Sequence, residues 1–76
     1  MATINDFKSF IVNDNRCSVI DNTDPNAIRF TVNFSSGFSR SELINRAADA
    51  NLWVLSRKIG PGPTLEYIVS TTKPSW

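Results

Sequence analysis

The strongest constraint on the fold is the alternating run AIRFTVNF at residues 27–34. Its apolar residues, Ile28, Phe30, Val32 and Phe34, are separated by single polar residues. Successive side chains of a strand point to opposite faces, so the run predicts a strand with one face in a core and the other in water. A strand that is wet on one face is typical of an antiparallel sheet covered on one side only.

Three further segments have the β-branched and aromatic composition of strands. They span residues 16–20, 52–59 and 65–72. The Asn, Asp and Pro residues of DNTDPNA, at 21–27, predict a turn before the alternating run. The Gly-Pro stretch at residues 60–63 separates the last two strands.

Two segments are predicted to be helices. The first begins after Thr3, which has Asp6 three positions later, and it ends near VNDN at residues 12–15. The second begins after Ser39, for which Glu42 completes the pattern of a capping box, and Asn51 is suited to a left-handed residue at its end.

The predicted order of elements is therefore αββαββ. We expect one α+β domain over residues 1–76, with a four-stranded, mostly antiparallel sheet and two helices packed on one face. The strand order is left open. Residues 73–76 are expected to form a C-terminal tail, with its flexibility also left open.

Several kinds of chemistry are disfavoured by the composition. The chain has one cysteine and no histidine, so it can form neither an internal disulfide nor a Cys/His zinc site. Histidine-dependent nucleophilic catalysis is excluded as well, and Cys17 is expected to be a packed, inert thiol. Asp21 and Asp24 are expected to bond their own turn rather than a metal ion. We expect no catalysis and no cofactor.

The formal net charge of +1 is too small to predict a nucleic-acid partner. Residues 1–26 carry two basic and four acidic side chains, which gives −2, whereas residues 27–76 carry six and three, which gives +3. The N-terminal segment lacks a basic stretch followed by a long apolar one, so no signal peptide and no membrane partner are expected. A cytoplasmic location is the resulting expectation.

The stretch GPGP, at residues 60–63, resembles a phosphate-binding loop only in its glycines. A phosphate nest needs several successive main-chain N–H groups, but Pro61 and Pro63 have none, and Gly60 and Gly62 alone can donate. Two interpretations stay open: a plain hairpin turn, or a stiff tip that contacts a partner with little loss of entropy.

Trp53 gives the best sequence indication of a contact surface. Leu52 and Val54 point to one face and Trp53 and Leu55 to the other, so the strand is either buried on both sides or exposes a large aromatic side chain. The candidate partner-binding residues are Arg29, Trp53, Arg57, Lys58, Gly60, Pro61, Gly62, Pro63, Tyr67 and Trp76.

These features predict a small, non-catalytic module that binds another protein, as an adaptor or a stoichiometric inhibitor of the type that viruses and mobile elements encode. The alternative is a nucleic-acid-binding domain in which Trp53 or Tyr67 stacks on bases. Its phosphate contacts would come from basic side chains, namely Arg29, Arg40, Arg46, Arg57 and Lys58. A homodimer through an unprotected strand edge is also expected to be available.

Overall fold

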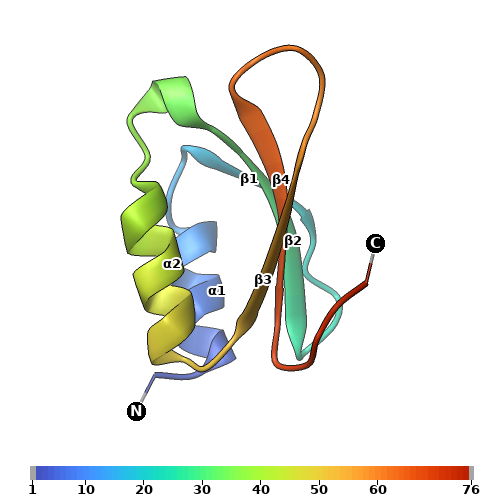
Figure 1. The fold of residues 1–76 in the computed structure, drawn as a ribbon. Coiled ribbons are helices and arrows are strands. Elements are labelled where there is room, and N and C mark those ends of the chain that lie inside the picture. The colour runs from blue at the N-terminus through green and yellow to red at the C-terminus, as the bar shows by residue number, and fades with distance from the viewer. Residues whose placement is uncertain (1, 76) are drawn as a thin grey trace.

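Two helices and four strands follow one another in the predicted order αββαββ, in a computed structural model that describes residues 2–75 (Figure 1). A short 3-10 turn, η1, follows the second strand. The elements are α1 (Ile4–Val12), β1 (Cys17–Asp21), β2 (Ala27–Asn33), η1 (Phe34–Ser36), α2 (Arg40–Asp49), β3 (Trp53–Lys58) and β4 (Thr64–Ser70).

The four strands form one antiparallel sheet with the order β1-β2-β4-β3. The last strand of the chain therefore lies in the middle of the sheet, beside β2. Because β2 and β3 are each antiparallel to β4, they are parallel to each other, and the connection through α2 crosses the sheet from one to the other. The β1 and β3 strands form the two edges.

Both helices pack on one face of the sheet, as Figure 1 shows, and within residues 2–75 no helix covers the other face. We call these the covered face and the open face. The covered face presents the apolar residues of the alternating run together with Tyr67 and Val69 of β4. Phe30 and Tyr67 are paired in register, with ring centroids 5.5 Å apart and the planes nearly parallel. Complete burial of such a side chain contributes about 1.5–3 kcal/mol.

The two helix starts differ in their capping. Thr3 has the complete capping box, because its hydroxyl accepts from the Asp6 N–H and the Asp6 carboxylate accepts from the Thr3 N–H at 2.8 Å. At α2 the predicted box is only half correct. The Ser39 hydroxyl accepts from the Glu42 N–H at 3.2 Å, but the Glu42 carboxylate pairs with Arg46, one turn later, at 3.1 Å. The guanidinium outcompetes the cap's N–H for this carboxylate.

Asn51 ends α2 in the left-handed conformation that the sequence predicts, with φ of 57°. The Leu52 N–H donates to the Ala47 carbonyl and the Asn51 N–H donates to the Ala48 carbonyl, which together form a Schellman motif. This motif turns the chain sharply out of the helix. The chain enters β3 at Trp53, directly after Leu52.

Candidate functional site

The open face is built from alternate residues of all four strands. The strand register places Trp53, Leu55 and Arg57 of β3 beside Ser70, Ile68 and Glu66 of β4. Arg29 of β2 lies opposite Ile68 on the other side of β4. Trp53 is half exposed, with 50% of its surface accessible, whereas Val54 pairs with Val69 on the covered face. The alternation read from the sequence therefore predicts the orientation of these side chains.

Glu66 lies at the centre of the open face. It is only 3% exposed, and it accepts hydrogen bonds from two arginines on the two neighbouring strands. The Arg29 guanidinium contacts Oε2 at 2.6 Å, and Nε of Arg57 contacts Oε1 at 2.7 Å. The hydrogen bond from Arg29 has the largest effect on the pKa of Glu66, and the bond from Arg57 adds to it. Together they hold this pKa below its ordinary value, even though burial of the carboxylate acts to raise it. We call Arg29, Glu66 and Arg57 the ion triad.

Glu66 was absent from the residues that the sequence singled out. A signal for it does exist, because it is a lone carboxylate within the apolar segment LEYIV. Its importance depends on the strand order, which places β4 between the strands that carry Arg29 and Arg57. Sequence alternation gives the face of a residue but not its neighbours on other strands.

Two of the candidate residues do not belong to the open face. Tyr67 is 1% exposed and lies in the core, because it alternates with Glu66 and so points to the covered face. Lys58 follows Arg57 directly and is exposed, but its place in the register is on the side of Leu65 and Tyr67. The expectation that either residue shares a surface with Arg29 and Arg57 is therefore wrong.

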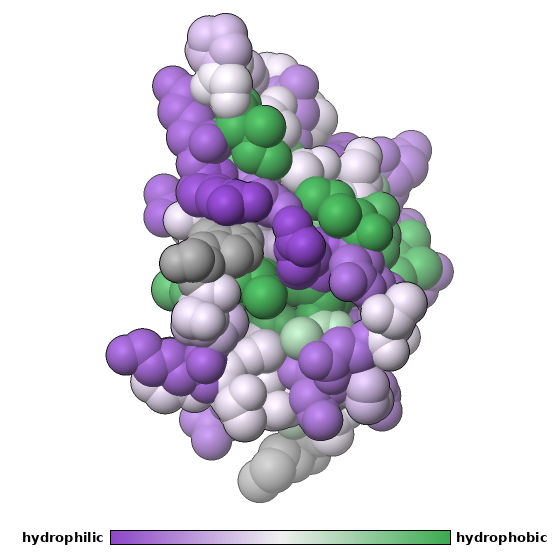
Figure 2. Space-filling view, turned by 90° about the vertical axis from the view of Figure 1, so that its right-hand side faces the viewer, coloured by the Kyte–Doolittle hydropathy of each residue, from purple (hydrophilic) through white to green (hydrophobic). Residues whose placement is uncertain are grey.

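Apolar side chains complete the open face. Ile68 and Leu55 are partly buried next to the ion triad, and Ile20, at the irregular end of β1, is 50% exposed. In Figure 2 the apolar side chains of this face form separate green patches, with hydrophilic side chains between them. A hollow of about 100 Å³ lies at one end, lined by Asp21, Asp24, Ala27, Ile28, Arg29 and Ile68.

The Gly-Pro stretch forms the loop between β3 and β4. The Ile59 N–H donates to the Thr64 carbonyl at 3.3 Å and so closes the hairpin, and Gly60 has a φ of 69°, which favours glycine. The Pro63 carbonyl accepts from the Phe34 N–H at 3.2 Å, which ties the base of the loop to the end of β2. The loop is thus anchored at its base, while Gly60, Pro61 and Gly62 project beyond the sheet.

The segment after β4 returns toward β3. The Ser70 hydroxyl donates to the Thr72 carbonyl, and Nζ of Lys73 lies 5.9 Å from the centre of the Trp53 ring. A cation therefore accompanies the exposed indole. Trp76, the other aromatic candidate, lies outside the described residues.

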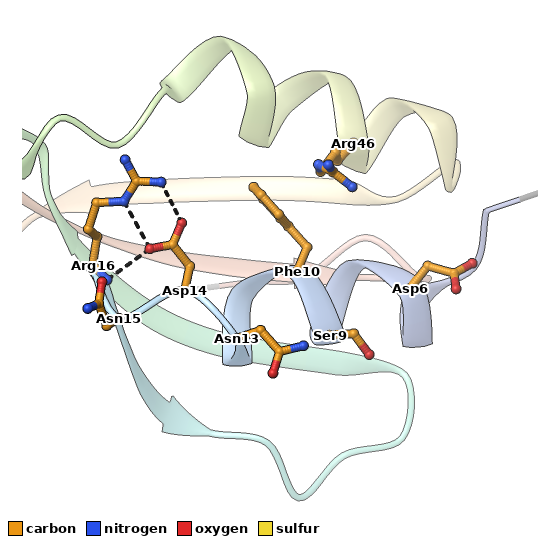
Figure 3. Close-up of a pocket in the computed structure, with 8 residues that line it drawn as sticks. All are labelled: Asp6, Ser9, Phe10, Asn13, Asp14, Asn15, Arg16 and Arg46. Atoms are coloured by element: carbon orange, nitrogen blue, oxygen red, sulfur yellow. Dashed lines mark hydrogen bonds and ion pairs between the residues drawn. The ribbon is translucent and has the colours of Figure 1, made fainter.

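A second surface feature, a groove on the helix side, was not foreseen from the sequence. It has a volume of about 820 Å³ and, as Figure 3 shows, runs along α1 beneath Arg46 of α2. The Arg46 guanidinium lies 4.3 Å from the centre of the Phe10 ring. The lining residues are Asp6, Ser9, Phe10, Asn13, Asp14, Asn15, Arg16 and Arg46.

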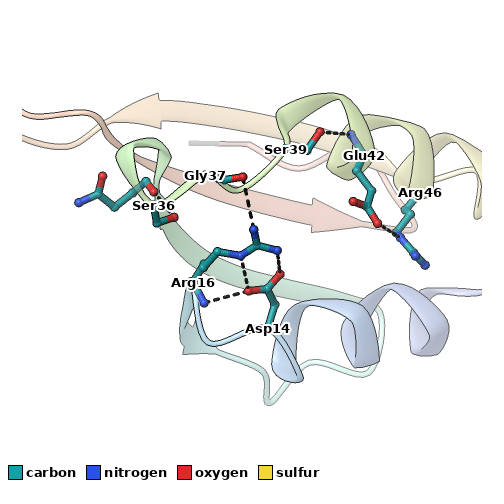
Figure 4. A network of polar contacts seen from close by, with 8 residues as sticks. Asp14, Arg16, Ser36, Gly37, Ser39, Glu42 and Arg46 are labelled. Carbon is teal, nitrogen blue, oxygen red and sulfur yellow. Dashed lines mark hydrogen bonds and ion pairs between the residues drawn. The ribbon is translucent and has the colours of Figure 1, made fainter.

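Three of the charged groups that line this groove, Asp14, Arg16 and Arg46, are in ion pairs. Arg16 makes a two-pronged contact with Asp14, at 2.8 and 2.9 Å, and also donates to the Gly37 carbonyl at 3.3 Å (Figure 4). The pKa of Asp14 is lowered by this contact. Arg46 makes a single contact with Glu42, one turn earlier on α2, at 3.1 Å. The bond from Arg16 to the Gly37 carbonyl joins the turn after α1 to the loop before α2, so Arg16 serves the packing of the two helices.

Cys17, Asp21 and Asp24, the residues considered for catalysis or metal binding, have surroundings that favour neither role. Burial raises the pKa of the Cys17 thiol to about 11, which disfavours the reactive thiolate. The Asp21 carboxylate accepts from the N–H and hydroxyl of Thr23, and Asp24 accepts from the Asn26 N–H at 2.8 Å. Within residues 2–75, no group of three or more Cys, Asp and Glu side chains is placed to hold a metal ion.

No family model, curated protein or solved structure matches this chain. Neither helix within residues 2–75 combines the length and the hydropathy that a membrane crossing needs.

Proposed function

We propose that this protein is a non-catalytic module that binds another protein through its open face, as an adaptor or a stoichiometric inhibitor. The observation that carries the proposal is the ion triad beside a half-exposed Trp53. Trp and Arg are the residues that most often dominate binding energy at protein interfaces. A charged face with apolar patches also suits the mixed core and rim of an interface.

The ion triad supports binding because it fixes two long side chains in advance. A free arginine loses rotamer entropy when a partner immobilises it, at a cost of about 0.5–1.5 kcal/mol. Arg29 and Arg57 are each held by a carboxylate that is itself 3% exposed. Part of the ordering cost is therefore met on folding. The anchored Gly-Pro loop beside β3 extends this ordered surface.

The alternative, nucleic-acid binding, receives less support from the same contacts. Arg29 and Arg57 share the charge of Glu66, and Arg46 is paired with Glu42. Such pairing lowers the positive potential available to phosphates. A salt series with single- and double-stranded oligonucleotides separates the two functions. Affinity that falls steeply with salt and with Arg57→Ala would favour nucleic acid, whereas absence of binding at low salt removes that alternative.

The decisive experiment is affinity capture with matched variants. The wild type and a Trp53→Ala, Arg57→Ala double variant are immobilised, together with Val12→Ala as a control. Val12 is as exposed as Trp53 but lies at the end of α1, away from the open face. We expect one partner to be captured by the wild type and the control and lost with the double variant. Equal capture by all three would contradict the proposal.

Three further elements of the proposal rest on the sequence. We propose a cytoplasmic site of action, in keeping with the unpaired thiol of Cys17. An origin in a virus or mobile element is proposed from the type of protein alone. A homodimer through a strand edge of the sheet is proposed as well.

A further inference from the structure

The two edges of the sheet differ in how well they can accept another strand. The β1 edge has five residues, and its register with β2 shifts between Val19 and Asp21, which is the kind of irregularity that blunts an edge. The β3 edge has six residues in unbroken register with β4 and contains neither proline nor glycine. Among the described strands, β4 alone pairs with it. An added strand therefore fits at β3.

The hydrogen-bond pattern shows which groups of β3 face outward. The Ile59 N–H donates to the Thr64 carbonyl, one step beyond the pair of Lys58 and Leu65. Antiparallel pairs alternate between bonded and non-bonded, so the odd-numbered residues of β3 bond to β4. The N–H and carbonyl groups of Val54 and Ser56 therefore point to the free edge.

We propose that β3 pairs antiparallel with β3 of a second copy of this chain, with the two-fold axis at Leu55. In this register Val54 faces Ser56 of the second copy, and the reverse, so that both pairs exchange their outward main-chain hydrogen bonds. Leu55 faces its own counterpart in a non-bonded pair, in which side chains approach most closely. The two four-stranded sheets become one continuous sheet.

The side chains of the open face are self-complementary in this register. Trp53 lies opposite Arg57 of the second copy, and this pairing occurs twice because of the two-fold symmetry. A guanidinium over an indole is a favourable cation–π pair, and the bond from Nε of Arg57 to Glu66 holds this guanidinium on the open face. With the two-fold axis at Val54, Arg57 would lie opposite Asn51 of the second copy. With the axis at Ser56, it would lie opposite Leu55. Neither register pairs Arg57 with Trp53.

The exposed side of α2 next to the β3 edge also favours a second copy as the partner. Leu43 and Ala47 of α2 are buried against the sheet, and Arg46 contacts the Phe10 ring of α1. Ile44 therefore lies on the opposite flank of α2, away from α1 and on the side of the β3 edge. Ile44 is 41% exposed. A second copy added at β3 carries its own α2 on the same face of the sheet and brings it toward this flank. Apolar surface beside the free edge is thereby covered.

The first test removes an outward hydrogen-bond donor. Proline lacks the N–H and is tolerated on a sheet edge where that group faces outward, as it does at residue 56. Sedimentation equilibrium over about 10 µM to 1 mM covers the range expected for a small interface. We expect a monomer–dimer equilibrium for the wild type and for Ser56→Ala, which keeps the N–H. Ser56→Pro should raise the dissociation constant at least about tenfold.

The second test addresses the register. In a Cys17→Ser background, Leu55→Cys places two thiols opposite each other at the two-fold axis, within the Cα distance of about 4.4–6.8 Å that a disulfide needs. Under mild oxidation we expect a covalent dimer. Ser56→Cys is the control, because its thiols are two residues out of register and point to the covered face.

Either of two results would overturn the proposal: a monomeric wild type at every concentration, or a cross-link with Ser56→Cys and none with Leu55→Cys. The circular dichroism spectrum and melting temperature of each variant establish that it is folded. Ser56→Pro keeps Trp53 and Arg57, so a failed dimer and a failed partner-binding role give different results. If the dimer fails but the partner-binding role holds, Ser56→Pro and Ser56→Ala still capture the partner.

Discussion

The two faces of the sheet bury different kinds of side chain. On the covered face the buried residues are apolar or aromatic, with Phe30 and Tyr67 stacked at the centre. On the open face the most buried group at the centre is a carboxylate, Glu66, with an arginine on each side. Apolar burial supplies folding free energy without fixing polar geometry. The open face instead fixes the geometry of polar groups, because it holds charged side chains in defined positions at the surface.

The largest loss of stability is expected for Phe30→Ala, on the covered face. Phe30 is fully buried against Tyr67 and Phe7, so its removal leaves a cavity and should cost about 3–5 kcal/mol of the free energy of unfolding. Urea denaturation followed by circular dichroism measures this loss. A cost below about 1 kcal/mol, as for a surface site, would mean that the covered face is not the core.

An intermediate effect is expected for Glu66→Ala. Its removal leaves Arg29 and Arg57 without their shared partner, and we expect a loss of about 2 kcal/mol, below the value for a fully buried pair because both arginines are partly exposed. Glu42→Ala is the matched control. It breaks an exposed pair with Arg46 and should cost less than about 0.5 kcal/mol. Equal losses in both variants would show that the ion triad is an ordinary surface pair.

Among the variants on the two faces of the sheet, the smallest effect on stability is expected for Trp53→Ala. Half of this side chain is already in water, so its truncation should change the free energy of unfolding by less than about 1 kcal/mol. The same variant is expected to weaken partner capture strongly. Thermal denaturation next to the capture assay compares the two effects. A large loss of stability would place Trp53 among the packing residues.

The fold was predictable because its signals are local. The alternation in AIRFTVNF, the caps at Thr3 and Ser39, and the left-handed Asn51 each need only a few neighbouring residues. The ion triad was not predictable in this way. Arg29 and Glu66 are 37 positions apart, and they meet only because β4 enters the sheet between β2 and β3.

Errors in the candidate list have the same origin. Arg57 and Lys58 are adjacent in sequence, and Glu66 and Tyr67 are adjacent too, but strand alternation sends the members of each pair to opposite faces. The sequence indicated Tyr67 because it is aromatic and overlooked Glu66 because it is a common charged residue. The residue types were informative, and the missing information was the register of β3 against β4.

The pKa of Glu66 gives the ion triad a pH dependence. Because the folded-state pKa is lowered by Arg29 and Arg57, the stabilisation is complete above the ordinary pKa of 4.5. It is lost as the pH falls through the lowered, folded-state value. Stability curves from pH 7 downward should therefore decline more steeply for the wild type than for Glu66→Gln, in which this group does not titrate.

The central claim is that Glu66 is ionised and held between two arginines on the open face. An NMR titration that follows the side-chain carboxyl carbon of Glu66 tests it most directly. The expected midpoint is below 4.5, and it should rise in Arg29→Ala and in Arg57→Ala, since each variant removes one of the two bonds. A midpoint at or above 4.5 in the wild type, as burial alone would produce, would contradict the account.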